Sequence, residues 1–238
     1  MASKKEINWD AIHKALDAWR KGLQAEREEA GFEKEPAVTT VAEHYRRDPW
    51  AVLVSTILSL RTKDDVTLET SRRLLAKAPG PARLAALRED QVARLAYPAG
   101  FYRTKAASLK KIAAILLQQY NGEVPPDMDA LLALPGVGRK TANLVLIEAF
   151  DLPGICVDVH VHRISNRCGW HRTENRYGTK TPEETEMSLR EILPKKYWKG
   201  INALLVLYGQ NLCRPVSPFC SRCVIKPHCK QVGVERSR

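Results

Sequence analysis

Lys140 stands where a helix is expected to begin, a position that is electrostatically unfavourable for a cation. The stretch LPGVGRKTANLVL, residues 134–146, places a glycine-rich turn directly before an apolar run that predicts a helix over residues 141–150. The positive end of a helix dipole and partial burial would each favour the neutral form of an amine. A lysine amine that loses its proton easily can act as a Schiff-base nucleophile. The sequence therefore predicts covalent chemistry at Lys140.

A carboxylate follows 18 residues later. Asp158 comes after the breaker Pro153-Gly154 and can cap a helix that carries His162 and Arg167. A carboxylate at this place could activate an attacking amine or stabilise positive charge that develops on a sugar. An aspartate at a helix start is far more often a plain cap, so the residues alone leave both roles open.

The turn before Lys140 is suited to hold a phosphate. Gly136 and Gly138 tolerate positive φ and let another chain come close, while Val137 can pack inward between the flanking helices. The exposed backbone N–H groups, with the positive end of a helix dipole behind them, form a cradle for an anion that Arg139 can help to hold. The alternative is an ordinary helix corner with two solvated cations. The glycines, the apolar residue between them and the flanking helices together favour the phosphate site.

Four cysteines near the carboxyl end predict a metal centre. Their pattern is C-x6-C-x2-C-x5-C within 17 residues, with prolines that limit helix formation between them. The candidate ligands are Cys213, Cys220, Cys223 and Cys229. Both structural zinc and an iron–sulfur cluster accept four thiolates, and the spacing alone leaves both open. The remaining cysteines, Cys156 and Cys168, are expected to be small buried side chains.

Helices are expected to position these groups, because apolar residues recur at helical spacing along nearly the whole chain. Ile12, Leu16 and Leu23 illustrate this near the start, and no segment alternates with a period of two. The sequence therefore predicts an all-α protein of about ten helices. At 238 residues with 44% apolar content, the chain can bury a large core, which argues against disorder.

The charge balance narrows the class of partner. Lys and Arg number 38 against 27 Asp and Glu, a net charge of +11, which suggests an anionic polymer or surface, although it could serve solubility alone. No stretch approaches the roughly 20 apolar residues that span a bilayer, and the amino terminus lacks the apolar core of a secretion signal. A membrane is therefore not expected as partner. The expected compartment is a reducing cytosol. In that compartment the cysteines are ligands more often than disulfides.

Together these motifs resemble the endonuclease III family of helix-hairpin-helix DNA glycosylases. The resemblance covers roughly residues 40–230, and NGEVPPD at 121–127 and VDVHVHR at 157–163 add to the motifs above. It implies two helical lobes flanking a DNA-binding cleft. The expected divisions are an amino-terminal helical extension on the cluster lobe (1–44), a helical barrel lobe (45–157) with the hairpin at about 128–150, and the rest of the second lobe (158–238) with the cluster loop 213–229.

The resemblance also implies an activity. Lys140 falls on the family's nucleophile and Asp158 on its catalytic aspartate, while the four-cysteine pattern falls on the ligands of a 4Fe-4S cluster. The implied reaction is removal of oxidised pyrimidines from double-stranded DNA, with cleavage of abasic sites by β-elimination through a Lys140 Schiff base. The implied protein is a monomer at the nucleoid, in the cytoplasm of a prokaryote. The alternative is a non-catalytic helix-hairpin-helix DNA-binding module with a structural or sensing cluster.

Two positions depart from the family's common residues. Arg61 stands where glutamine is usual, and Phe101 where leucine is usual. Both positions are expected to contact DNA: one probes the base opposite the lesion, and the other fills the gap that extrusion leaves. Residues 49–61 contain no acidic residue, which separates the chain from the adenine-mismatch branch with its catalytic glutamate. The preferred lesion and opposite base stay open.

Overall fold

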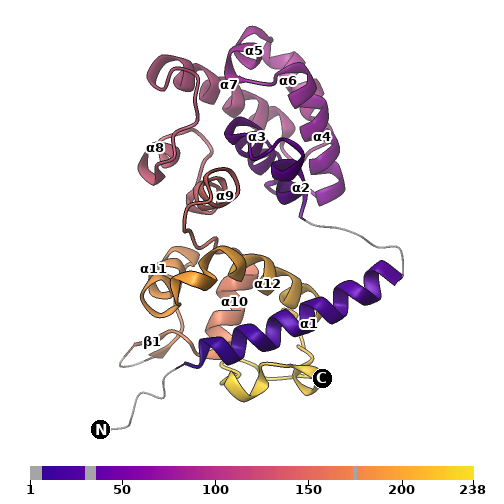
Figure 1. Cartoon of the computed structure of the whole chain (residues 1–238), viewed down its shortest axis with the longest axis vertical. Coiled ribbons are helices and arrows are strands. Elements are labelled where there is room, and N and C mark those ends of the chain that lie inside the picture. The colour runs from indigo at the N-terminus through magenta and orange to yellow at the C-terminus, as the bar shows by residue number, and fades with distance from the viewer. Residues whose placement is uncertain (1–6, 30–35, 174–175) are drawn as a thin grey trace. The chain divides into compact units, whose positions relative to one another are not determined.

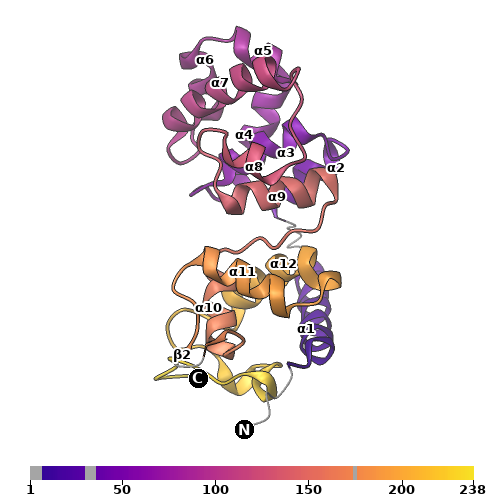
Figure 2. The ribbon, with the colours of Figure 1, turned by 90° about the vertical axis from the view of Figure 1, so that its left-hand side faces the viewer.

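Helices make up nearly all of the regular structure in the computed structural model, which describes residues 7–29, 36–173 and 176–238. These residues form twelve α-helices in two units, whose ribbons appear in Figures 1 and 2. The hairpin unit comprises Lys34–Gly154, and the cluster unit comprises Met1–Glu33 together with Ile155–Arg238. The prediction of an all-α protein is confirmed.

The hairpin unit contains one helix, α3 (Pro49–Ser59), that is almost entirely buried. Its side-chain cap is Asp48, which accepts a hydrogen bond from Ala51 N (2.8 Å). Residues 50–58 are all buried, because α3 packs against neighbours on several sides. The other helices of this unit are α2 (Ala37–His44), α4 (Asp64–Lys77), α5 (Pro81–Ala86), α6 (Glu89–Ala96), α7 (Tyr102–Gln119), α8 (Met128–Leu132) and α9 (Arg139–Phe150).

Helix α2 belongs to the hairpin unit, whereas the sequence analysis placed it with the amino-terminal extension. It packs against α3 and α4, and its residues Val38, Val41 and Ala42 are buried in the core of this unit. Ile155, in contrast, is fully buried in the core of the cluster unit. The divisions therefore fall after Glu33 and after Gly154, and not after residues 44 and 157. The reason is that apolar faces on the two sides of each division pack into different cores.

The cluster unit joins the amino-terminal helix to the last third of the chain. Helix α1 (Trp9–Glu29) packs against α12 (Trp198–Asn211), where Trp19 lies edge-on to Tyr208 with 4.8 Å between ring centroids. The unit also contains α10 (Val159–Cys168), α11 (Pro182–Ile192) and single 3-10 turns at Lys195–Tyr197, Cys220–Arg222 and Lys226–His228. A short antiparallel ladder of β1 (Arg172–Thr173) and β2 (Arg176–Tyr177) was not predicted, because two residues per strand are too few to show alternation.

His171 is a buried histidine of the cluster unit. Its side chain is 3% exposed, and its Nδ1 lies 2.8 Å from Ser188 Oγ. Burial, followed by the charge of His162, lowers the pKa of His171 from 6.5 to about 4. Between these two pH values the unfolded chain binds more protons than the folded chain, so stability is lost as the pH falls through this window.

We expect this one group to lower the free energy of unfolding by up to about 3 kcal/mol between pH 7 and pH 4. Urea unfolding at several pH values across this range measures the loss. In His171→Asn, which can still hydrogen-bond to Ser188, the loss should be smaller than in the wild type. An identical pH dependence in the two proteins would show that other groups cause the acid sensitivity.

Candidate functional site

The turn between α8 and α9 has the features expected of a phosphate cradle. Gly136 adopts a φ of +81°, and a Cβ on it would lie 3.3 Å from Ser108 Oγ, so this position favours glycine. Val137 is 7% exposed and packs into the core of the hairpin unit. Gly138 differs from the expectation, since its φ of −97° and ψ of 177° are extended and need no glycine. Its missing side chain instead leaves an exposed backbone that a ligand could approach closely.

Helix α9 begins directly after this turn. Gly138 is its N-cap residue and has no side chain with which to cap the helix. The first-turn N–H groups of a helix have no acceptor within the helix and attract anions. Arg139 is the first residue of α9 and is partly exposed. The geometry is therefore suited to a phosphate of a nucleic acid backbone.

Lys140 is the second residue of α9, in its first turn, because the helix begins at Arg139, two residues earlier than the predicted range of 141–150. Its side chain is exposed, so the partial burial that the sequence analysis considered as a second reason for a neutral amine is not present. Lys140 therefore lies beside the phosphate cradle, on the first turn of the same helix. A nucleophile at this position belongs to the surface of the hairpin unit and not to its core.

Asp158 is the N-cap of α10 and belongs to the cluster unit. Its Oδ1 accepts hydrogen bonds from the backbone N–H groups of His160 and Val161, both at 2.9 Å. The plain capping role is thus observed. In the described part of the chain no hydrogen bond uses Oδ2, and the residue is only half-buried. One oxygen can therefore hold the helix while the other serves chemistry.

Arg61 and Phe101 lie side by side in the hairpin unit, although they are far apart in the sequence. The Arg61 guanidinium carbon is 5.4 Å from the centroid of the Phe101 ring. Arg61 follows α3, Phe101 precedes α7, and a Cβ on Gly100 would overlap Arg61 O. The Phe101 ring is 62% exposed. A large apolar ring that is exposed and backed by a cation is suited to insertion between bases.

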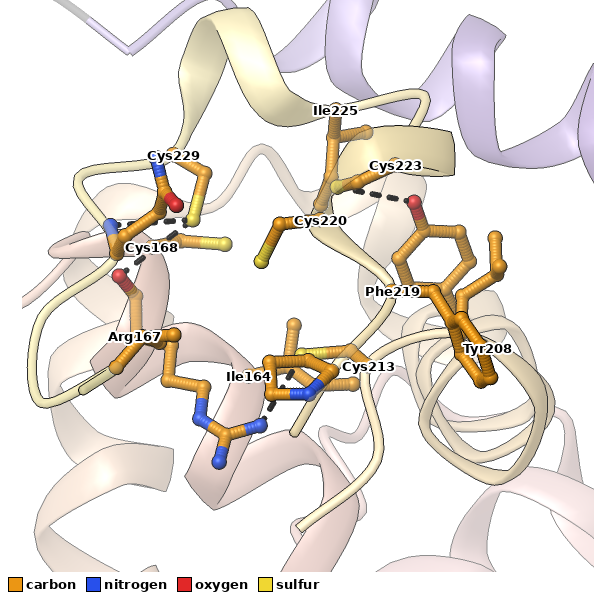
Figure 3. A pocket seen from close by; sticks show the side chains of 14 residues that line it. Ile164, Arg167, Cys168, Tyr208, Cys213, Phe219, Cys220, Cys223, Ile225 and Cys229 are labelled. Atoms are coloured by element: carbon orange, nitrogen blue, oxygen red, sulfur yellow. Dashed lines mark hydrogen bonds between the residues drawn. The ribbon is translucent and has the colours of Figure 1, made fainter. Parts of the chain in front are cut away.

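The four predicted cysteine ligands line one pocket of the cluster unit, which Figure 3 shows from close by. Its walls are largely apolar, with Ile164, Phe219 and Ile225 among them. Hydrogen-bond donors reach several of the sulfur atoms. The Arg167 guanidinium donates to Cys213 Sγ (3.5 Å), the Tyr208 hydroxyl to Cys223 Sγ (3.3 Å) and Gln231 N to Cys229 Sγ (3.4 Å).

This donor set fits a polynuclear cluster. As the described side chains lie, no three His, Cys, Asp or Glu residues converge to hold one metal ion. The cysteines surround a pocket instead, and thiolates with apolar walls and donors to sulfur are the usual surroundings of iron–sulfur clusters. Burial raises the pKa of the Cys213 and Cys223 thiols, so a metal that binds these thiolates would have to displace their protons.

A fifth cysteine also lines the pocket. Cys168 is buried, as the sequence predicted, but the prediction missed that it faces the same pocket as the four ligands (Figure 3). Its hydrogen bond to Cys229 lowers the pKa of the Cys229 thiol to about 7. Cys156, also buried as predicted, is not among the residues that line the pocket. Spacing could not have separated these two, because only the fold brings Cys168 to the other thiols.

Comparison with known proteins identifies the family. Residues 54–195, more than half of the chain, match the family described as HhH-GPD superfamily base excision DNA repair protein. The chain belongs to this superfamily. Within the superfamily, endonuclease III of Thermotoga maritima is 44% identical over 187 residues, which cover 79% of this chain and 85% of that protein. Endonuclease III of Escherichia coli is 36% identical over 182 residues, covering 76% and 83%.

A solved structure supports the same placement within the HhH-GPD superfamily. A trapped endonuclease III–DNA covalent intermediate matches with a TM-score of 0.72 and 31% identity, covering 94% of this chain and 96% of that chain. The resemblance to endonuclease III is confirmed. The chain spans 60% and 47% of two chloroplastic endonuclease III homologs of Arabidopsis thaliana. Among the helices that the structure describes, none combines the length and apolar character needed to cross a membrane.

Proposed function

We propose that this base excision repair enzyme removes oxidised pyrimidines from duplex DNA and then cleaves the strand at the abasic site, with Lys140 as nucleophile and Asp158 as catalytic carboxylate. One observation carries the proposal. Lys140 is an exposed residue in the first turn of α9, next to a glycine turn suited to a DNA phosphate. The relative with a trapped covalent DNA intermediate supports a nucleophile that bonds to DNA.

Binding begins at the backbone. In the proposed complex the N–H groups that open α9, together with Arg139, hold a phosphate near the lesion. Arg61 and Phe101 then occupy the space that the damaged nucleotide leaves when it is extruded from the stack. The net charge of +11 favours this partner, because phosphate contacts dominate the affinity of proteins for DNA.

The chemistry then proceeds at the sugar. The neutral Lys140 amine attacks C1′, the bond from C1′ to the base breaks, and the base leaves with the electron pair and takes up a proton. Transfer of a proton from nitrogen to O4′ and opening of the C1′–O4′ bond then give a Schiff base. A proton leaves C2′, the electrons expel the 3′ phosphate, and water then hydrolyses the Schiff base and restores the lysine. Asp158 stabilises the positive charge on the sugar or accepts a proton.

We further propose that Cys213, Cys220, Cys223 and Cys229 hold a 4Fe-4S cluster. Such a cluster would supply a rigid framework for the loop over 213–230, which has no acidic residue and contains cations that can face DNA, namely Arg214, Arg222, Lys226 and Lys230. The thiols and the donors to their sulfur atoms support this assignment.

Purified protein should be yellow-brown and contain iron and sulfide in equal molar amounts, about four of each per chain. Elemental analysis and the absorption spectrum measure this. Cys223→Ser should lose most of the iron, whereas Cys156→Ser, a matched change at a buried cysteine of the same unit, should retain it. A colourless protein with stoichiometric zinc would contradict the proposal.

Borohydride trapping tests the proposed function directly. Borohydride reduces a Schiff base to a stable amine, so wild-type protein and abasic duplex DNA should give a covalent complex. A panel of duplexes with different oxidised pyrimidines, scored for base release and for nicking, then defines the substrates. Binding to damaged duplex without trapping or nicking would favour the non-catalytic DNA-binding module instead.

The setting we propose is that of a monomer at the nucleoid of a prokaryotic cytoplasm. Relatives in Thermotoga maritima and Escherichia coli support a prokaryotic setting. Relatives named chloroplastic show that the family also works in other compartments. Size-exclusion chromatography with light scattering measures the oligomeric state.

A further inference from the structure

Lys105 is a buried cation that the proposed chemistry does not use. It lies in the first turn of α7 and is 6% exposed. Its Nζ donates hydrogen bonds to the carbonyl oxygens of Leu58 (2.8 Å) and Leu60 (2.6 Å) and to Thr62 Oγ1 (2.9 Å). An ammonium group has three N–H donors, so one short segment takes all three.

That segment is the carboxyl end of α3 and the residues after it. Carbonyl groups at a helix end lack partners within the helix and carry the negative end of its dipole, so they accept well from a cation. Burial nevertheless lowers the pKa of Lys105 to about 8, which means that its charge is held here at a free-energy cost. An apolar side chain would fill the same volume without that cost, which points to a role in what the segment carries.

The segments that Lys105 joins carry the two exposed residues Arg61 and Phe101. Arg61 directly precedes Thr62, whose Oγ1 accepts hydrogen bonds both from Lys105 and from Gly100 N (3.0 Å). Gly100 directly precedes Phe101. One hydroxyl thus connects the buried lysine to the backbone on both sides of the Arg61–Phe101 contact.

Both exposed residues have left-handed backbone conformations, with φ of 52° at Arg61 and 56° at Phe101. This region costs a residue other than glycine on the order of 1 kcal/mol and persists only where the surroundings impose it. We infer that Lys105 is a positioning residue that holds Arg61 and Phe101 together as one rigid wedge for extrusion of the damaged nucleotide. The inference rests on the proposed function and deepens it, since it names what makes the wedge rigid.

Lys110 offers a matched control on the same helix. Its Nζ donates hydrogen bonds to the carbonyl oxygens of Ala85 (2.6 Å) and Leu87, at the carboxyl end of α5. That segment carries neither Arg61 nor Phe101. Lys110 therefore joins two helices as Lys105 does, without a connection to the wedge.

The experiment compares Lys105→Met, Lys105→Arg and Lys110→Met. Extrusion is followed by the fluorescence of 2-aminopurine placed next to the lesion, in a Lys140→Gln background that stops the chemistry. Lys105→Met should lower the extrusion equilibrium in that background by about tenfold, the effect of losing roughly one net hydrogen bond, and in protein that retains Lys140 it should lower the kcat/KM of base release by about the same factor. The rate ratio between opposite bases should also change. Lys105→Arg should recover most of both effects, and Lys110→Met should show neither.

Equal losses in Lys105→Met and Lys110→Met would reduce Lys105 to a stabilising residue and overturn the inference. If Lys105→Met does not fold, Thr62→Val is the deciding variant, because it keeps the side-chain volume and removes only the shared hydroxyl. Weaker extrusion in Thr62→Val supports the inference, and extrusion equal to the wild type overturns it. Failure of the proposed function can be told apart from failure of this inference, since wild-type protein would then release no base and nick no abasic DNA.

Discussion

Lys140→Gln should abolish borohydride trapping and slow the nicking of abasic DNA by at least about a thousandfold, while affinity for duplex DNA changes by only a few-fold. Removal of a nucleophile typically costs this much or more. Glutamine is similar in size but has no nucleophilic amine. Because the Lys140 side chain is exposed, the substitution disturbs no buried packing. Single-turnover nicking, gel analysis of trapped complexes and a binding titration measure the three quantities.

Arg139→Gln is the matched control, since it removes the same charge from the adjacent residue of α9. It should weaken DNA binding and reduce the dependence of affinity on salt, while trapping at saturating enzyme is retained. The contrast separates a lysine that bonds to sugar from a cation that only holds phosphate. Covalent trapping by Lys140→Gln at the wild-type rate would remove Lys140 from the mechanism.

The local structure of the hairpin could be predicted from the sequence because it depends on neighbours in the chain. A turn ahead of an apolar run, an inward-facing Val137 and a lysine at a helix start follow from spacing, and α9 begins one turn of backbone after Gly136. The same holds for the cap at Asp158, whose partners are two and three residues away. Hydrophobic periodicity and helix capping both depend on residues only a few positions apart, so the sequence shows them directly.

Contacts between distant segments could not be predicted in the same way. The exposure of Lys140, the hydrogen bonds of Lys105 to residues more than forty positions earlier, and the approach of Cys168 to Cys229 all depend on how helices pack. A buried lysine in an otherwise periodic helix has no sequence signal of its own. The placement of α2 was missed for a related reason, because an apolar stripe does not say which core it joins.

Asp158→Asn should lower the rate of base release by about a hundredfold to a thousandfold and leave the thermal unfolding midpoint nearly unchanged. Asn caps a helix about as well as Asp, so Oδ1 should still accept from His160 N and Val161 N. What is lost is the negative charge, and a positioned carboxylate that moves a proton or stabilises a cation contributes this much. Single-turnover base release and calorimetry measure the two effects.

Asp48→Asn provides the matched control, because Asp48 also caps a helix through its side chain, at Ala51 N, and has no proposed part in the chemistry. It should leave both rate and midpoint near the wild type. Asp158→Ala removes the cap as well as the charge, so it should match Asp158→Asn in rate loss but also lose roughly 1 kcal/mol of stability. If Asp158→Asn releases base at the wild-type rate while Asp158→Ala is slow and unstable, Asp158 is only the cap of α10, and the carboxylate of the reaction must be another residue.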